Sequence, residues 1–321
     1  MGASLSFPKD EISPDRTYLV TGGNTGIGYE VAKNIALLGG HVIIACRNMP
    51  KAEAAIKQMQ KEYEDDFHDK LKNEPDAINK DPRKLNLEVM EVDLASFKST
   101  KRFIDEFKAR NCKLNVLICN AGVSAQNREL TEDGFELMLQ ANYLSHLLII
   151  LHFVPILMAS GDDSRIVQTS SLMHIFAKHN INDMNAEKSW GESKTYGNSK
   201  LYQIMFMYWM ARNLKNNSVT ISCCNPGLVS TQMTQNASSF FVKTYVNSFM
   251  ARRPYDGATT IIKCAVDQSL KGQTGIYLSD CKMKCTSDLS MNPVIQDEVA
   301  KWSFESLKPY LPDNLSDIFD L

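Results

Sequence analysis

Short apolar runs rich in β-branched residues alternate along the chain with longer segments whose apolar positions recur at helical spacing. The short runs lie at residues 17–20, 41–46, 87–92, 115–119, 165–169 and 219–224, and a further short strand is predicted at 274–278. Helical periodicity marks the segments near 26–38, 50–64, 96–110, 131–158 and 195–215. Because strands separated by helices form βαβ units, the pattern predicts an α/β fold with a parallel sheet covered by helices on both faces.

We expect one such domain at residues 15–284, between an N-terminal extension, 1–14, and a C-terminal tail, 285–321, that carries no usable motif. The segment 61–86 interrupts the pattern, because 14 of its 26 residues are charged. It predicts an extended helix end followed by a solvated loop. The segment 232–254 is rich in aromatic residues. Those residues either line an apolar substrate pocket or pack the loop onto its own core.

Composition and charge exclude several classes of protein. Hydrophobic residues make up 44% of the 321 positions, enough to bury a sizeable core. The 35 Lys and Arg residues against 37 Asp and Glu give a formal net charge of −2, which argues against a nucleic-acid partner. Eight cysteines are ordinary usage for a reducing compartment. The opening residues contain no apolar run, so we expect a cytoplasmic protein.

Two features bear on membranes. The apolar segment Leu144–Met158 is shorter than the roughly 20 residues of a spanning helix, so we expect a buried core or subunit-interface helix. Met1-Gly2 followed by Ser6 matches an N-myristoylation pattern, although such short patterns often arise by chance. A single acyl chain at Gly2 would give only weak, reversible membrane association.

A glycine-rich turn follows the first predicted strand and opens the first predicted helix. Its candidate phosphate-binding residues are Gly22, Asn24, Thr25, Gly26, Ile27 and Gly28. Gly22 permits the tight turn, Gly26 lets the backbone approach a pyrophosphate, and Gly28 allows close packing of helix on strand. The free N–H groups and the dipole of the helix start favour negative charge there. The turn therefore predicts a dinucleotide site.

The second predicted strand bears on the choice of cofactor. It ends at Cys46 and is followed by Arg47, with no acidic residue nearby to bind the adenosine ribose. A guanidinium can pair with a 2′-phosphate, so NADP(H) is favoured over NAD(H). The alternative is an arginine that only stacks on adenine.

Tyr196 and Lys200 lie four residues apart on a predicted helix and therefore share a face. A nearby ammonium stabilises phenolate, so we expect Lys200 to lower the pKa of Tyr196 and make it a general acid/base. Such a pair alone is common on protein surfaces. It indicates a catalytic site here because the glycine-rich turn precedes it in the chain.

The order of these motifs resembles the short-chain dehydrogenase/reductase family over about residues 15–280, through Thr21-Gly-Gly-Asn-Thr-Gly-Ile-Gly28, Asn120-Ala-Gly122 and Tyr196-Gly-Asn-Ser-Lys200. The resemblance implies a single Rossmann-type, doubly wound domain. It assigns catalysis to Asn142, Ser171, Tyr196 and Lys200, with Asn142 holding a water of the proton relay. Its further cofactor contacts are Asp93, Leu94, Asn120, Ala121, Gly122, Pro226, Gly227, Val229 and Thr231, together with Tyr196 and Lys200.

The segments TGGNTGIG and IIACRN, and the spacing of Ser171 and Tyr196, resemble retinol dehydrogenases and the oxidoreductase part of WW-domain oxidoreductases. The resemblance implies a small apolar carbonyl or alcohol substrate, such as a retinoid, steroid or lipid aldehyde. It also implies a homodimer or homotetramer assembled through the Leu144–Met158 and Tyr196 helices. The alternative function is a non-catalytic, cofactor-binding scaffold or regulatory protein on the same fold.

Three further features favour structural roles. Cys281 and Cys285 lack the third and fourth ligands of a zinc site, so no metal is expected. Cys223-Cys224 occupy adjacent strand positions, so they are expected to pack on opposite faces of the sheet. His146 and His152, on the apolar helix, are expected to be hydrogen-bonded core residues.

Overall fold

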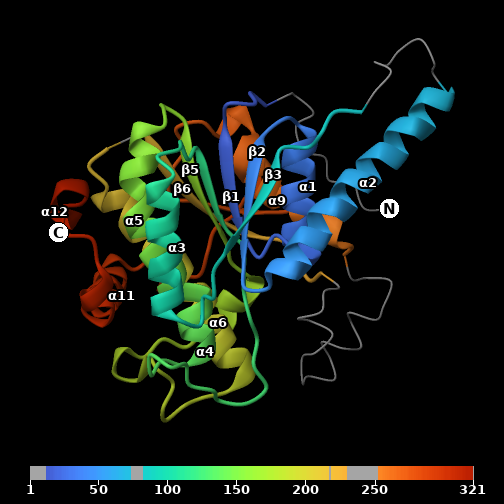
Figure 1. Ribbon diagram of the computed structural model, residues 1–321. Coiled ribbons are helices and arrows are strands. Elements are labelled where there is room, and N and C mark those ends of the chain that lie inside the picture. Colours follow the sequence, from blue (N-terminus) through green and yellow to red (C-terminus); the bar gives the residue numbers. More distant parts are fainter. Residues whose placement is uncertain (1–11, 74–81, 217, 230–251, 321) are drawn as a thin grey trace.

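The computed structural model describes residues 12–73, 82–216, 218–229 and 252–320, which form a central sheet flanked by helices (Figure 1). The strands are β1 (Thr17–Thr21), β2 (His41–Cys46), β3 (Leu87–Glu91), β4 (Val116–Cys119), β5 (Ser164–Thr169), β6 (Val219–Asn225), β7 (Ile276–Ser279) and β8 (Lys282–Met283). Their order in space is β3-β2-β1-β4-β5-β6-β7-β8. All neighbours pair in parallel except β7 and β8. The predicted Rossmann-type α/β fold is confirmed.

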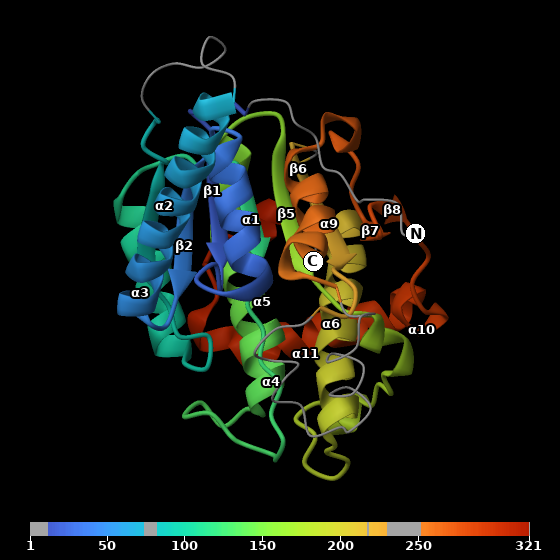
Figure 2. The same cartoon turned by 90° about the vertical axis from the view of Figure 1, so that its right-hand side faces the viewer.

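The longer helices are α1 (Gly26–Leu37), α2 (Met49–Asn73), α3 (Phe97–Ala109), α5 (Ser145–Ala159), α6 (Glu192–Asn213), α9 (Pro254–Val266) and α11 (Pro293–Leu307). Short helices are α4 (Leu137–Leu139), α10 (Asp288–Met291) and α12 (Leu315–Ile318). Helices α1, α2 and α9 cover one face of the sheet, while α3, α5 and α6 cover the other (Figures 1 and 2).

Each face of the sheet carries its own hydrophobic core because strand side chains point alternately to the two sides. Neighbouring residues of one strand therefore enter different cores. Cys223 packs in the core beneath α5 and α6, whereas Cys224 packs beneath α9, and both side chains are fully buried. Their predicted packing on opposite faces is confirmed.

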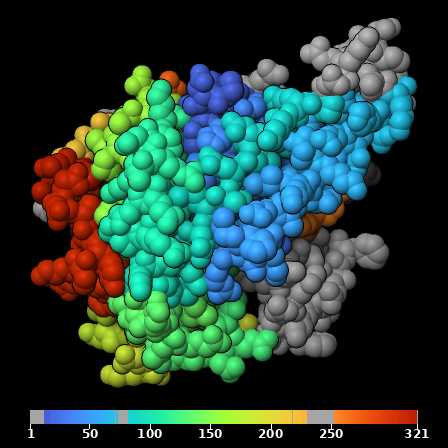
Figure 3. All heavy atoms as spheres, in the orientation of Figure 1, coloured from blue at the N-terminus to red at the C-terminus, as the bar shows by residue number. Residues whose placement is uncertain are grey.

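Helix α2 carries the start of the charged segment. Its last turns project beyond the body of the molecule (Figures 1 and 3). Exposed ion pairs join Lys70 to Asp66 and Lys72 to Asp69. The predicted helix extension is therefore present as far as Asn73, and residues 74–81 lie outside the described part of the chain.

The helix predicted at 131–158 begins later, and its predicted start is wrong. Gly134 has a φ of +83°, which breaks a helix, and residues 130 and 136 pair as an isolated bridge. The Glu136 carboxylate then caps the helix by accepting the N–H of Leu139 at 2.8 Å. Helix α4 starts at Leu137 and continues through a π-turn, Gln140–Leu144, into α5.

The C-terminal segment after residue 284 packs into the same core as the sheet, through α10, α11 and α12. Leu307, Ile318 and Phe319 are buried. The ring of Phe319 lies 5.3 Å from that of Trp209 on α6. This segment is therefore part of the globular body, and a buried aromatic pair of this kind stabilises it.

The continuous helical segment Leu137–Ala159, which ends with α5, is long and apolar enough to span a membrane. However, 83% of its most hydrophobic stretch is buried inside the protein. Its histidines are hydrogen-bonded. His146 contacts Thr21, and His152 contacts Lys108 and the carbonyl oxygen of Tyr310. The expected core helix with hydrogen-bonded histidines is confirmed.

Candidate active site

Strand β1 ends in a glycine-rich turn that leads directly into α1. Gly22 and Gly26 have φ angles of +68° and +58°, which other residues rarely adopt. A Cβ on Gly28 would lie 2.3 Å from the Gly22 carbonyl oxygen, so the approach of α1 to the turn requires glycine. The first turn of α1 contains no acidic side chain. The turn therefore fits the pyrophosphate of a dinucleotide.

The ends of β1 and β4 are fastened together by Thr21. Its hydroxyl oxygen accepts the N–H groups of Asn120 and Ala121, both at 3.0 Å. The Asn120 amide in turn donates to the Thr21 carbonyl oxygen at 2.9 Å. Ala121 then lies so close to Gly22 that a Cβ added to Gly22 would be 3.0 Å from the Cα of Ala121. This corner is the switch point of the sheet, where α/β proteins bind ligands.

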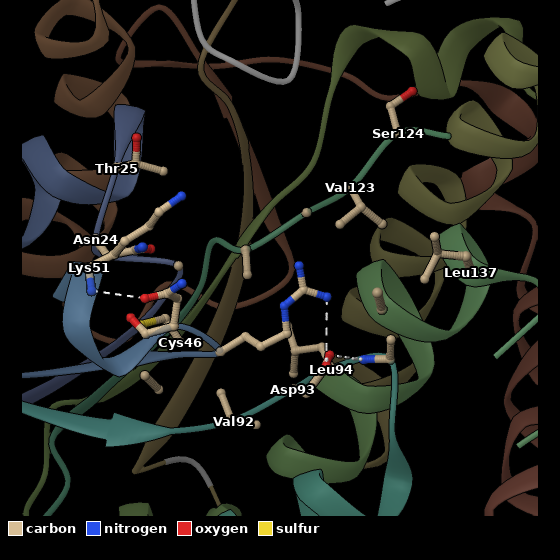
Figure 4. A pocket seen from close by; sticks show the side chains of 18 of the residues that line it. Asn24, Thr25, Cys46, Lys51, Val92, Asp93, Leu94, Val123, Ser124 and Leu137 are labelled. Carbon is tan, nitrogen blue, oxygen red and sulfur yellow. Dashed lines mark hydrogen bonds and ion pairs between the residues drawn. The ribbon is translucent and has the colours of Figure 1, made fainter. Parts of the chain in front are cut away.

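Two adjoining cavities, of about 1190 and about 390 Å³, lie along the carboxyl ends of the strands. Both are lined by Gly22, Asn24, Thr25, Ala121, Gly122 and Ser124. They therefore form one continuous cleft. In the larger cavity, Asn24, Thr25 and Lys51 lie along one wall and Val123, Ser124 and Leu137 along the opposite one (Figure 4).

The larger cavity brings together Arg47, Asp93 and Leu94. The Arg47 side chain is 76% exposed, and its guanidinium lies 3.7 Å from the Asp93 carboxylate. Lys51, in the first turn of α2, also lines this cavity and was missed from the sequence. Its position four residues after Arg47 was the sequence feature that could have identified Lys51 as a residue of this cavity. Two cations therefore face this end of the cleft.

The smaller cavity brings together Ser171, Tyr196 and Lys200. Tyr196 and Lys200 extend from one face of α6, and the Lys200 Nζ lies 5.6 Å from the centre of the Tyr196 ring. That Nζ donates a hydrogen bond to the Thr169 carbonyl oxygen at 2.9 Å. Ser170, the neighbour of Ser171, instead donates its hydroxyl to the Lys200 carbonyl oxygen at 3.0 Å. Ser171 is therefore the serine available to a ligand.

Burial dominates the electrostatics of these groups. It lowers the pKa of Lys200 to about 8. It also raises the pKa of Tyr196 to about 12, while a hydrogen bond with Ser171 acts in the opposite direction. The expected lowering of the Tyr196 pKa by Lys200 is therefore wrong for this structure, because the ring is desolvated and the ammonium is turned to Thr169.

Asn142 lies in the π-turn and is fully buried. Its side chain accepts the N–H of Val123 at 2.7 Å and donates to the Ser199 hydroxyl at 3.1 Å. Its carbonyl oxygen contacts the His146 ring at 3.0 Å and accepts from the Gln203 amide at 2.8 Å. Protein groups therefore engage both polar ends of Asn142, which holds the wall of the cleft next to Lys200.

The segment after β6 completes the smaller cavity through Pro226, Gly227 and Val229. Gly227 has a φ of +81°. Other residues rarely adopt such a φ, so the turn again favours glycine. Thr231 lies outside the described residues.

The proposed apolar wall is present only in part. Met173 lines the smaller cavity, as does Leu228. His174 is buried with its ring 5.3 Å from that of Tyr277, and the Phe176 side chain is 67% exposed and does not line the cavity. The predicted aromatic residues Phe240, Phe241, Tyr245 and Phe249 lie outside the described part of the chain.

Ser124, Glu192 and Ser193 also line the smaller cavity and were missed from the sequence. Glu192 and Ser193 form the first turn of α6, one turn before Tyr196. They add polar groups to a cavity that Ser171, Tyr196 and Lys200 also line.

Comparison with known proteins places this geometry in context. Residues 16–240 match the profile of the short chain dehydrogenase family. The chain is 31% identical to retinol dehydrogenase 12 of Mus musculus over 92% of this chain and 87% of that protein. It is 33% identical to human polyprenol dehydrogenase, over 90% of this chain and 84% of that protein.

Solved structures share the fold. A short chain dehydrogenase from Salmonella enterica serovar Typhi has a TM-score of 0.63 at 20% identity, covering 86% of this chain and 100% of that one. A 3-oxoacyl (acyl-carrier-protein) reductase from Agrobacterium tumefaciens with NADP bound has a TM-score of 0.60 at 20% identity, covering 83% and 93%.

Proposed function

Since this chain belongs to the short-chain dehydrogenase family of NAD(P)-dependent oxidoreductases, which interconvert carbonyls and alcohols, we propose that it uses NADP(H), an apolar substrate and Tyr196 as acid/base. The observation that carries the proposal is the convergence of Ser171, Tyr196 and Lys200 on the smaller cavity, beside the glycine-rich turn. A nucleotide-binding turn alone would support binding only, whereas these side chains add proton transfer.

The dinucleotide, when bound, supplies or accepts the hydride. In the direction of reduction, the Ser171 hydroxyl donates a hydrogen bond to the substrate carbonyl oxygen, which polarises it. The Tyr196 hydroxyl then gives its proton to the same oxygen as negative charge develops there. Lys200 would bind the ribose next to the nicotinamide, and its Nζ, 5.6 Å from the centre of the Tyr196 ring, keeps a positive charge close to that ring. Asn142 holds the wall that positions Lys200.

The raised pKa of Tyr196, about 12, is compatible with its proposed role as the general acid of carbonyl reduction. At neutral pH the phenol keeps its proton, as a general acid must. An alkoxide is a stronger base than a phenolate, so it takes the proton even from a phenol with this pKa.

Arg47 and Lys51 support the choice of NADP(H). Both line the larger cavity, and the Arg47 guanidinium contacts Asp93 through an exposed ion pair. Such exposed ion pairs contribute little energy, so a 2′-phosphate can replace Asp93 as the partner of Arg47. Asp93 and Leu94, which line the same cavity, would then contact the adenine.

Met173 and Leu228 support an apolar substrate, as do the names of the relatives, which are dehydrogenases of retinol and of a polyprenol. We therefore assign a retinoid, a steroid or a lipid aldehyde or ketone to the smaller cavity. Purified protein incubated with NADPH or NADH and all-trans-retinal, steroid ketones or medium-chain aldehydes tests the assignment. NADPH oxidation with none of these carbonyls would contradict it.

Assembly and location belong to the same proposal. We place the protein in the cytoplasm, with reversible membrane contact through an acyl chain on Gly2, a residue outside the described part of the chain. Sedimentation with vesicles, compared between wild type and Gly2→Ala, tests that contact.

A homodimer or homotetramer through α5 and α6 would have little exposed surface of these two helices to bury. Residues 145–154 of α5 are all buried, and α11 packs on α6.

A further inference from the structure

The imidazole of His146, in the first turn of α5, joins two separate parts of the cleft. Its Nε2 lies 2.9 Å from the Thr21 hydroxyl oxygen, and its Nδ1 lies 3.0 Å from the Asn142 carbonyl oxygen. The side chain is fully buried, and it does not line either cavity. Its hydrogen bonds to the site run through Thr21 and Asn142.

The partners determine the protonation state of the ring. A carbonyl oxygen only accepts hydrogen bonds, so Nδ1 carries the hydrogen and donates it to Asn142. Nε2 is then an acceptor, and the Thr21 hydroxyl donates to it. The same hydroxyl oxygen accepts the N–H groups of Asn120 and Ala121. Each group thus donates to the next: the N–H groups at the end of β4 to Thr21, Thr21 to His146, and His146 to Asn142 in the π-turn.

Each end of this chain of hydrogen bonds shapes a different part of the site. At one end, Ala121 packs against Gly22 in the dinucleotide turn. At the other, the Asn142 side chain contacts the Ser199 hydroxyl, one residue before Lys200. A displacement of either end would therefore change the binding of the dinucleotide, the position of Lys200, or both.

We propose that His146 is a positioning residue that keeps the dinucleotide turn and the Asn142–Lys200 wall in register, an inference that rests on the function proposed above. An apolar residue of similar size could fill the same space in the core. It would leave the Thr21 hydroxyl hydrogen with only the longer contact to the Ile118 carbonyl oxygen, at 3.4 Å, and would remove one of the two donors to the Asn142 carbonyl oxygen. Glutamine can replace the ring because its amide both donates and accepts.

The test compares His146→Leu, His146→Gln and the control Ile150→Ala, which empties a fully buried position one turn further along α5. The dissociation constant for NADPH, kcat with a carbonyl substrate and Tm are measured for each. His146→Leu should raise the dissociation constant and lower kcat, each about tenfold, as expected for loss of one hydrogen bond. His146→Gln should restore both. Ile150→Ala should lower Tm alone.

Wild-type binding and turnover in folded His146→Leu, or no recovery in His146→Gln, would overturn the proposal. If His146→Leu does not fold, His146→Asn replaces it, because the shorter amide reaches the Asn142 carbonyl but not Thr21. A dissociation constant for NADPH equal to that of wild type would then overturn the proposal. A wild-type protein that binds NADPH but reduces no carbonyl refutes the proposed function instead, and NADPH binding still tests His146.

Discussion

The Nζ of Lys200 lies 5.6 Å from the centre of the Tyr196 ring and donates its hydrogen bond to a backbone carbonyl oxygen, that of Thr169. The ammonium group of Lys200 is therefore held by the backbone of β5 while it lies beside the Tyr196 ring. Burial shifts the two pKa values in opposite directions, to about 8 for Lys200 and about 12 for Tyr196. Both shifts favour the neutral form of the side chain.

The pKa of Lys200 predicts how dinucleotide capture depends on pH. Lys200 is protonated below about pH 8 and loses its charge above it. Measured as kcat/KM for NADPH, which reports groups of the free enzyme, the rate should fall as pH rises through about 8. Lys200→Met should abolish this decline and leave a low, flat profile. A wild-type profile that is level up to pH 10 would contradict the role given to Lys200.

Arg47 and Lys51 are predicted to set the preference for the 2′-phosphate. Arg47→Ala and Lys51→Ala should each weaken NADPH binding about tenfold, as expected for loss of one charge-assisted contact, and leave NADH binding almost unchanged. Lys57→Ala removes the same charge from an exposed position of α2 outside both cavities, so it serves as the control. Equal losses for both dinucleotides would show that these cations do not recognise the 2′-phosphate.

Gly28→Ala should disrupt the turn, because the added Cβ would lie 2.3 Å from the Gly22 carbonyl oxygen and 2.5 Å from the Asn120 amide nitrogen. We expect a loss of about 3 kcal/mol of stability, together with loss of dinucleotide binding. Gly191→Ala, where the nearest atom would be 3.9 Å away, should behave like wild type. Chemical denaturation measures both variants, and a fully stable Gly28→Ala protein would refute the close approach.

His146 predicts an acid limit to stability. Burial and the charge of Lys200 lower its pKa to about 4, from an ordinary value of 6.5. Between these values the unfolded chain binds a proton that the folded protein does not. Stability should therefore fall as pH decreases through this window, by about 3 kcal/mol in all for this group. Denaturation of wild type and His146→Gln at pH 7 and pH 4 measures the difference; identical pH dependence would exclude His146 as its source.

The strands were predicted from their short apolar runs, because the central strands are buried on both faces. Most helices were predicted from their periodicity, because a helix that packs on the sheet buries one face. The start of the helix at 131 was wrong because Gly134 and the Glu136 cap are local events within an apolar pattern. Helix α9 went unpredicted beyond Pro254, since it follows a segment with weak boundaries. The helices after residue 284 were missed because their apolar residues are scattered among charged ones.

At the site, the motifs predicted which residues would meet, because βα turns and strand ends gather at one edge of a parallel sheet. They could not predict the electrostatics. The direction of the Tyr196 pKa depends on how deeply the ring is buried and on where Lys200 points. Nor could they connect His146 to Thr21, which lies 125 residues away in the sequence.

The central claim is that Tyr196 transfers the proton while the dinucleotide is bound. It is tested most directly by following NADPH oxidation with an active carbonyl substrate in wild type, Tyr196→Phe and the control Tyr208→Phe. Tyr208 lies further along α6, and its hydroxyl contacts Thr286. We predict that Tyr196→Phe binds NADPH as wild type does but loses about 10²–10⁴-fold in kcat, while Tyr208→Phe stays active. Turnover by Tyr196→Phe at the wild-type rate would contradict the account.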